Sequence, residues 1–327
     1  MKLMFRRRLL AALGGLAVIG LSAPVQAQDA YPTKPVRVLV GFAPGGGTDL
    51  AGRLMADALT KALGGNFVVE NKPGVGGLLA LEEVANAAPD GYTIGVGGSG
   101  PLTVSPYVYA SRNFDPMDKL EPVVWFLNQP GVIVVAPTLK VKSVPELLKA
   151  SKDSKSGLNM ASAGTGSMIQ MMGEHFQSQE GVKWQHVPYK GSGPALTDLA
   201  AGRVDVMIDV VTSAAPQVKG GRINALAVTS EKRSSMLPDV PTLRELGVGD
   251  YDMGSWMGLV VPKGTPQSVI TRINTALNDA LKSPEFVARM ASVGEPVGGS
   301  PERFRQRIDA ERARWSKIVK SENIKPQ

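Results

Sequence analysis

The stretch "GFAPGGGTDLAGRLM" (41–55) decides how the chain begins to fold. It follows the apolar run "VRVLV" (36–40) and leads into a pattern in which apolar residues recur on one helical face. A glycine cluster therefore lies where a strand gives way to a helix. Glycines there let the backbone approach a ligand, and the free amides of the helix favour an anion. The expected contributors are the amides of Gly45, Gly46 and Gly47, with Thr48 or Asp49 as the helix cap.

The order of strand followed by helix repeats along the chain. Near-continuous apolar runs of strand length are typical of sheets that are covered on both faces. Helical patterns separate them, with Ser143, Thr265 and Ser300 as expected starts. This alternation predicts an α/β protein with mostly parallel sheets. The expected strands are 36–42, 67–70, 92–97, 122–127, 131–137, 158–163, 184–189, 204–209, 224–230 and 257–262.

The first 27 residues have the pattern of a secretory signal peptide. A basic start that includes Arg6 to Arg8 precedes an apolar centre and a small-residue end at Ala27. Cleavage after Ala27 leaves residues 28–327, and both the general and the twin-arginine export routes stay open. Glycines and Pro24 interrupt the apolar run, so we expect no membrane segment in the mature, exported chain.

Composition excludes several classes of function. The net charge of +7 includes four basic leader residues, so the mature chain carries about +3 and has no basic arm for nucleic acid. The chain contains no cysteine, which excludes disulfides, thiolate catalysis and zinc–thiolate sites. A mature length of about 300 residues corresponds to two domains or one large one.

Glycine-rich turns recur at 43–49, 95–101, 163–168 and 190–198. Any one of them could be only a tight connection. Four at the carboxyl ends of strands, where open α/β sheets bind their ligands, favour a binding site. The turn "GVGGSG" also matches a dinucleotide fingerprint, but Pro101 and an extended-looking segment follow it, and no acidic residue closes the unit, so that reading is weak.

Catalytic groups are few. His175 and His186 belong to no metal-binding spacing and are interpreted as structural. The serines lack a nucleophile-elbow context. Asp205 is expected to be solvated, and the methionines after the third turn and the tryptophans to pack in the core. The residues alone therefore predict an exported α/β protein that binds a small anionic ligand through backbone amides, without metal or cofactor.

Six blocks of sequence together resemble the Bug family of periplasmic solute-binding receptors of tripartite tricarboxylate transporters. They span the mature chain in order, which makes the resemblance specific at the level of the family. The blocks are "YPTKPVRVLVGFAPGGGTDLAGRLMADAL" (31–59), "VENKPGVGG" (69–77), "PDGYTIGVG" (89–97), "VPYKGSGPALTDLAAGRVDVMID" (187–209), "LAVTSEKRSSMLPDVPTLRELG" (226–247) and "SWMGLVVPKGTP" (255–266).

This resemblance implies a two-lobed Venus-flytrap fold of type II. Residues 28–128 and 229–327 would form the first lobe, and residues 129–228 the second. The protein would be a monomeric receptor rather than an enzyme, closing on its ligand and presenting it to integral-membrane transporter subunits. Two alternatives stay open: a sensor subunit for a membrane signalling kinase, and an exported nicotinamide-dependent enzyme.

The resemblance also implies the site. A ligand carboxylate would be bound by backbone amides and waters between the two turns, with Ser99 and Asp209 completing the pocket. Where many relatives carry a histidine, this chain has Gln170 among methionines, and we hypothesise a pocket that accepts an apolar or aromatic body; burial of these methionines in the core is the alternative. The implied residues of the turns are Phe42, Ala43, Gly45, Gly46, Gly47, Thr48 and Asp49, and Ala163, Gly164, Thr165 and Ser167.

Overall fold

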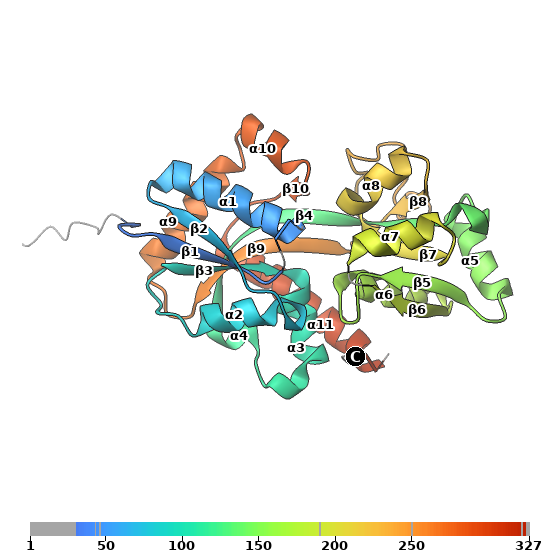
Figure 1. Ribbon diagram of the computed structural model, residues 1–327, viewed down its shortest axis with the longest axis horizontal. Helices are drawn as coiled ribbons and strands as arrows, with labels where there is room; N and C mark the ends of the chain where they lie inside the picture. The colour runs from blue at the N-terminus through green and yellow to red at the C-terminus, as the bar shows by residue number, and fades with distance from the viewer. Residues whose placement is uncertain are drawn as a thin grey trace, which may run out of the picture.

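The computed structural model describes residues 31–42, 44–45, 47–189, 191–249, 251–321 and 323–324. Two lobes lie side by side, joined by long segments that run between them (Figure 1). The predicted signal peptide, residues 1–27, lies outside the described residues. In the part of the chain that the structure describes, no helix combines the length and the apolar character that a bilayer crossing needs.

The first lobe alternates strands and helices up to the long strand β4, and the chain returns to this lobe with strand β9. Its elements are β1 (Val36–Val40), α1 (Gly47–Leu63), β2 (Phe67–Asn71), η1 (Val75–Gly77), α2 (Leu78–Ala85), β3 (Thr93–Gly98), η2 (Gly100–Val104), α3 (Ser105–Val108), η3 (Ala110–Arg112), α4 (Pro116–Lys119), β4 (Leu120–Val135), β9 (Gly254–Pro262), α9 (Gln267–Ala280), α10 (Pro284–Met290), β10 (Glu295–Pro296) and α11 (Pro301–Ser321).

The second lobe follows the same alternation. Ser143 caps its first long helix by accepting a hydrogen bond from the Glu146 amide, as the sequence predicts. Its elements are η4 (Pro137–Leu139), α5 (Val144–Asp153), β5 (Leu158–Ser162), α6 (Met168–Glu180), β6 (Trp184–Pro188), α7 (Ser192–Ala200), β7 (Val206–Val210), α8 (Val211–Lys219) and β8 (Asn224–Val228).

Ten described strands form one mixed sheet that passes from lobe to lobe. Its order is β2-β1-β3-β9-β4-β7-β5-β6, and β8 and β10 also pair with β4. β1 pairs in parallel with β2 and β3, and β5 with β6 and β7, whereas β4 and β9 run antiparallel to their neighbours. Each lobe therefore has a parallel core, and the antiparallel pairs lie where the chain crosses between lobes.

The prediction of two separate strands at 122–127 and 131–137 is wrong, because the structure has the single strand β4 here. A single strand of 16 residues covers 122–127 and 131–135, and Pro130 lies inside it opposite Gly254. Its first part pairs with β9 and its last part with β7 and β8. Gly131 lies at the change of partner, where an added Cβ would come within 2.7 Å of Thr229 Oγ1. Only glycine therefore fits this crossing.

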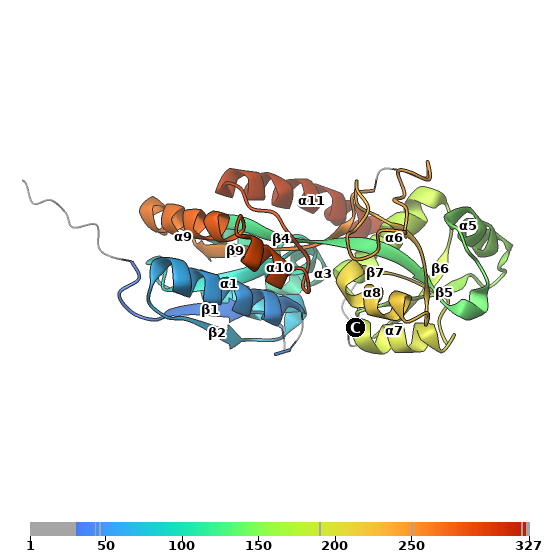
Figure 2. The same ribbon diagram turned by 90° about the horizontal axis from the view of Figure 1, so that it is seen from above.

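Several segments connect the lobes. The Gly131 amide donates to the Met253 carbonyl and to Thr229 Oγ1, which connects the three crossing segments. Helix α11 runs along the same side of both lobes (Figure 2). Its Phe304 packs in a first-lobe core and its Trp315 in the core of the second lobe. Residues after 229, among them Leu243, also pack in the second-lobe core. The lobe boundaries at 128 and 228 stay predictions.

Two local predictions are wrong. The segment after "GVGGSG", expected to be extended, forms the helical turns η2 and α3, because Pro101 and Pro106 occupy first-turn positions that tolerate proline. The glycines before it belong to strand β3 rather than to a turn. Thr265, expected as a helix cap, instead donates through Oγ1 to the Pro262 carbonyl at 2.7 Å, and α9 begins at Gln267.

Candidate functional site

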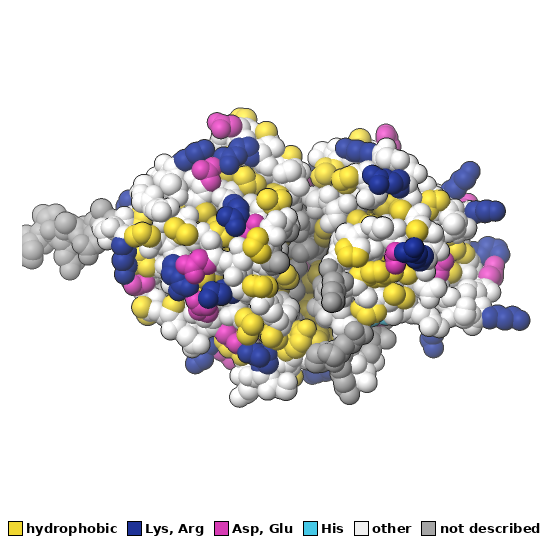
Figure 3. Space-filling model, in the orientation of Figure 1, with side chains coloured by type: hydrophobic (Ala, Val, Ile, Leu, Met, Phe, Trp, Pro, Cys, Tyr) yellow, Lys and Arg dark blue, Asp and Glu magenta, His cyan; other side chains and the backbone are white. Residues whose placement is uncertain are grey.

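A cavity of about 450 Å³ lies between the two lobes. The first lobe contributes the start of α1, the turns before α3 and the edge of β9, and the second lobe contributes the starts of α6 and α8. The groove between the lobes carries hydrophobic side chains on both of its sides (Figure 3). This is the position where two-lobed α/β proteins bind small molecules.

The turn at the start of α1 is held in place by Asp49, whose side chain is only 2% exposed. Its carboxylate accepts hydrogen bonds from the Gly45 amide at 2.9 Å, Arg53 Nε at 3.0 Å and Asn71 Nδ2 at 2.9 Å. Burial alone would raise the pKa of Asp49, but these hydrogen bonds outweigh it and keep that pKa below its usual range. Asp49 is therefore a buried anion that orients the turn and does not cap the helix.

The second-lobe turn, 162–170, is fixed by neutral groups. Ser162 Oγ accepts from the Gly164 amide at 3.1 Å and lies 2.6 Å from His186 Nε2. Gln170 Oε1 accepts from the Gly166 amide at 2.8 Å. Gly164 has a φ of +129°, which side chains rarely adopt, so this turn requires glycine. Gln170 thus holds the turn through a hydrogen bond to its backbone.

Three long helices begin at the cavity, and their first amides have no acceptor among the described residues. They are the amides of Gly47 and Thr48 in α1, Met168 and Ile169 in α6, and Thr212 and Ser213 in α8. Helix N-termini carry a partial positive charge and attract anions. Thr165 Oγ1 is buried at the same place without a partner. The cavity therefore offers unused donors to an acceptor-rich ligand.

No described residue that lines this cavity is charged. Hydroxyl groups line it at Thr48, Ser99 and Ser255, for example, and the Ser99 and Ser255 oxygens lie 3.1 Å apart. Positive potential in the described wall thus comes from peptide dipoles and not from lysine or arginine. The described residues also contain no cluster of three or more histidines or carboxylates that could bind a metal ion.

The structure brings most of the predicted site residues together. Eight of them line the cavity: Phe42, Gly47, Thr48, Ser99, Ala163, Gly164, Thr165 and Ser167. Gly45 and Asp49 do not belong to the lining; the Gly45 amide donates a hydrogen bond to the Asp49 carboxylate. Ala43 and Gly46 lie outside the described residues.

Asp209 lies just below the cavity and is fully buried. Its Oδ1 accepts from Ser192 Oγ and from the Val210 amide, both at 2.8 Å, while Oδ2 has no hydrogen-bond partner. Burial raises the pKa of Asp209 to about 7, against the opposing effect of the two donors. The next residue, Val210, lines the cavity.

Several wall residues were not predicted. Gln129, Tyr109, Thr212 and Ser213 come from segments that carry none of the identified motifs, so no signal pointed to them. Ser255 begins the block 255–266 but was not named as a site residue. Trp256 and Met168, interpreted as packing residues, line the cavity as well as packing. Met171 and Met172 are fully buried, as a core role requires.

The two histidines have structural surroundings. His175 lies edge-on to Tyr251 and Trp315, with ring centroids 5.9 and 5.8 Å away. Burial and the nearby Arg314 lower the pKa of His175 to about 4. Burial also lowers the pKa of His186, so both rings are neutral at pH 7.

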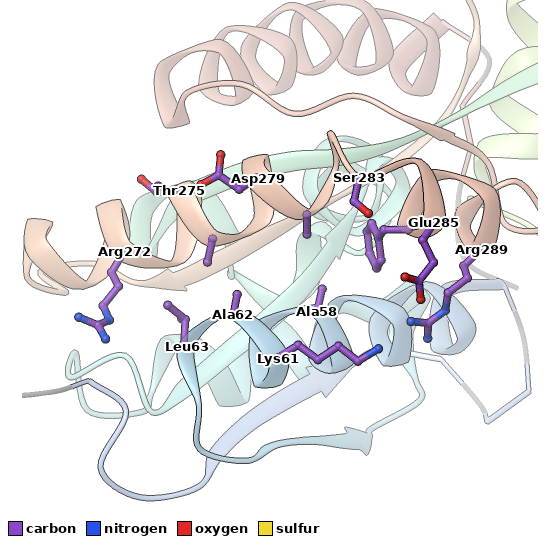
Figure 4. A pocket seen from close by; sticks show the side chains of 13 residues that line it. Ala58, Lys61, Ala62, Leu63, Arg272, Thr275, Asp279, Ser283, Glu285 and Arg289 are labelled. Carbon is purple, nitrogen blue, oxygen red and sulfur yellow. The ribbon is translucent and has the colours of Figure 1, made fainter.

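A second hollow, of about 600 Å³, lies on the first lobe between α1, α9 and α10 (Figure 4). Its lining is alanine-rich, and long charged side chains surround it. Lys61 and Arg289 pair with Asp57 at 3.3 and 2.7 Å, and Asp279 pairs with Lys282 at 3.0 Å. Arg272 and Glu285 also line this hollow. The cleft between the lobes, where the starts of helices from both lobes meet, is the better candidate for a ligand.

The fold and this cleft define a two-lobed α/β periplasmic binding protein. The sequence model of the tripartite tricarboxylate transporter family receptor matches residues 51–324. The chain therefore belongs to this receptor family, which includes the Bug proteins, and the family is one of binding proteins and not of enzymes.

Three relatives illustrate the similarity. BugT of Bordetella pertussis is 36% identical over 321 residues, which cover 97% of this chain and 98% of BugT. A solved R. palustris structure with adipate is 36% identical, with a TM-score of 0.81, covering 91% of this chain and 100% of that one. MatC from Rhodopseudomonas palustris with bound malate is 32% identical, with a TM-score of 0.76, covering 88% of this chain and 100% of that one.

Proposed function

We propose that this protein captures a small organic carboxylate in the cleft between its lobes and delivers it to a tripartite tricarboxylate-type membrane transporter. One observation carries the proposal: unused amides at the starts of α1, α6 and α8, and the unpartnered Thr165 hydroxyl, meet at one cavity. Relatives with solved structures contain adipate and malate, which are both carboxylates.

Capture follows from the position of these donors on both lobes. A carboxylate held by first-lobe amides gains further hydrogen bonds when the second-lobe turn approaches. The ligand then binds the closed state more tightly than the open one and shifts the population towards closure. The crossing segments at Gly131, Thr229 and Met253 are the proposed hinge.

The location of the protein follows from the leader. We propose that the chain is exported, that the signal peptide is cleaved after Ala27, and that the mature receptor acts as a monomer in the periplasm. Mass spectrometry of the protein from a periplasmic extract tests the cleavage site, and size-exclusion chromatography with light scattering tests the monomer.

A thermal-shift screen of residues 28–327 tests the binding function. The screen contains adipate, malate, citrate, aliphatic and aromatic monocarboxylates, amino acids and NAD(P). A ligand that binds only the native state stabilises it by about 2.7 kcal/mol at a hundredfold excess over Kd. A concentration-dependent rise in Tm with carboxylates supports the receptor. A rise with NAD(P) alone would favour the nicotinamide-dependent enzyme and overturn the proposal.

A further inference from the structure

We propose that Glu311 of α11 is a positioning residue that holds the two lobes in their relative arrangement, because its single buried carboxylate meets groups that belong to both lobes. Glu311 is only 3% exposed and does not line the ligand cavity. Its role does not depend on which ligand the cavity binds.

Helix α11 runs along both lobes and is anchored in each of them by an aromatic side chain (Figure 2). Phe304 packs edge-on against Trp256 of β9 in a first-lobe core, with ring centroids 5.3 Å apart. Trp315, about three turns later in the helix, packs in the second-lobe core and edge-on against His175 of α6. A change in the angle between the lobes must therefore move one anchor relative to the other.

Glu311 lies between these two anchors along the helix. Its Oε2 accepts a hydrogen bond from Trp315 Nε1 at 3.2 Å, and its Oε1 pairs with Arg307 Nη2 at 2.6 Å. Burial raises the pKa of Glu311, while Arg307 and the indole groups of Trp256 and Trp315 act in the opposite direction. The Trp256 N–H thus lies near the carboxylate, yet it has no hydrogen-bond partner among the described residues. A small shift of α11 against β9 would make this further bond.

The same part of α11 also holds a segment that crosses between the lobes. Arg307 Nη1 pairs with the Asp252 carboxylate at 2.8 Å, and Arg314 Nη1 donates to the Asp252 carbonyl at 3.4 Å. Asp252 has a φ of +30°, a conformation that side chains rarely adopt and that neighbouring contacts must maintain. The next residue, Met253, accepts from the Gly131 amide at the proposed hinge. Helix α11 therefore fixes the backbone beside the hinge.

Strand β9 separates Glu311 from the ligand cavity. Successive side chains of a strand point to opposite faces. Ser255 lines the cavity, with its hydroxyl 3.1 Å from that of Ser99, while the ring of the next residue, Trp256, lies against α11. A shift of Trp256 towards Glu311 would move this strand, which links the position of α11 to the cavity wall.

Double electron–electron resonance between the lobes of the ligand-free mature protein tests the proposal. The chain contains no cysteine, so Thr271→Cys on α9 and Lys219→Cys on α8 give two specific sites for spin labels. In this background, Glu311→Gln should broaden the distribution of distances about twofold, since the lobes sample more arrangements. Glu302→Gln, the same change at an exposed position of the same helix, is the control and should leave the distribution unchanged. An unchanged distribution in Glu311→Gln would overturn the proposal.

The indole signals of a ¹H–¹⁵N spectrum test the partners of Glu311 separately from stability. The four tryptophans give four signals, each assigned by replacing one tryptophan with phenylalanine. Glu311→Gln should move the signals of Trp256 and Trp315. It should leave the signal of Trp184 in place, because that indole donates to Ser151 Oγ at 2.9 Å. A Trp256 signal that does not move would show that its N–H lies away from the carboxylate, and would contradict the assignment.

Asp252→Asn decides the question if Glu311→Gln does not fold. This change weakens the pairing with Arg307 at a half-exposed side chain, and asparagine tolerates a positive φ. The distances between the labelled lobes should broaden in the same way, by a smaller factor. An unchanged distribution, together with a native unfolding transition, would show that α11 does not set the arrangement of the lobes.

Discussion

Asp49 and Asp209 are buried aspartates in different lobes, and each is adjacent in sequence to a residue that lines the cleft. Asp49 accepts three hydrogen bonds, one of them from Arg53, which outweigh its burial and lower its pKa. Asp209 accepts two hydrogen bonds from neutral donors, keeps one oxygen unpartnered, and has a pKa raised to about 7. The first lobe therefore fixes its turn with a permanent charge, while the second lobe contains a carboxyl group that changes charge near neutral pH.

The largest effect is expected for Asp49→Asn. The amide cannot accept all three hydrogen bonds, so we expect the free energy of unfolding at pH 7 to fall by about 2 to 3 kcal/mol and the affinity for a carboxylate to fall at least tenfold. Because the folded pKa of Asp49 is lowered, its contribution is present above pH 4 and is lost as pH falls through that folded pKa. Denaturant titrations at several pH values measure it.

A matched control is Asp153→Asn, which removes an exposed pair with Lys149 on the second lobe. Exposed pairs contribute little, so the free energy of unfolding should change by less than about 0.5 kcal/mol. Similar losses for both variants would mean that the position of Asp49 under the turn has no special role.

Asp209→Asn tests whether the buried carboxyl group of the second lobe makes the stability of the protein depend on pH. The folded pKa of Asp209 is raised to about 7, so the folded state binds more protons than the unfolded state between pH 4 and 7. The wild-type protein therefore loses stability as pH rises through this window, and the variant does not. The Tm of the variant minus that of the wild type, measured without ligand, should increase from pH 5 to pH 8. A difference that stays constant with pH would show that Asp209 does not titrate there.

Gln170→Leu tests the neutral support of the second-lobe turn. Loss of the acceptor for the Gly166 amide should weaken carboxylate binding about fivefold and cost about 1 to 2 kcal/mol of unfolding free energy. Gln185→Leu is the control, since Gln185 Nε2 bonds the Ser156 carbonyl on the exposed surface. If titration calorimetry gives wild-type affinity for Gln170→Leu, the turn does not depend on this side chain.

The smallest effect is expected for Ser162→Ala. This change removes the hydroxyl between His186 and the Gly164 amide, a neutral contact whose loss corresponds to a two- to fivefold decrease in affinity. Ser154→Ala, which removes a similar bond to the Gly157 carbonyl in another loop, should leave affinity unchanged. Equal affinities for the two variants would count against the role of Ser162.

The strands and long helices were predictable because their cause is local. Apolar runs such as 36–40 and 158–162 became strands at nearly the predicted bounds, and Phe304, Ile308 and Trp315 form the buried face of the last helix. The break expected near Pro130 was wrong because proline ends a strand only where a partner needs its amide. The helical turns after Pro101 were missed because apolar and β-branched residues there resemble a strand.

The lining of the candidate site was predictable where it depends on backbone geometry. The glycine turns and helix starts identified Gly47, Thr48, Gly164 and Thr165, which line the cleft. The cavity lining outside the glycine turns could not be predicted. Its residues, such as Tyr109, Ser213 and Trp256, come together only after the two lobes have formed and packed.

A crystal structure of the mature protein with a bound carboxylate, chosen from the thermal-shift screen, tests the central claim most directly. The account predicts that the carboxylate oxygens lie within hydrogen-bonding distance of main-chain amides at the start of α1 and in the second-lobe turn, 162–170, and that Thr165 Oγ1 also bonds to the carboxylate. A carboxylate bound instead by a lysine or arginine side chain, or in the hollow between α1, α9 and α10, would contradict it.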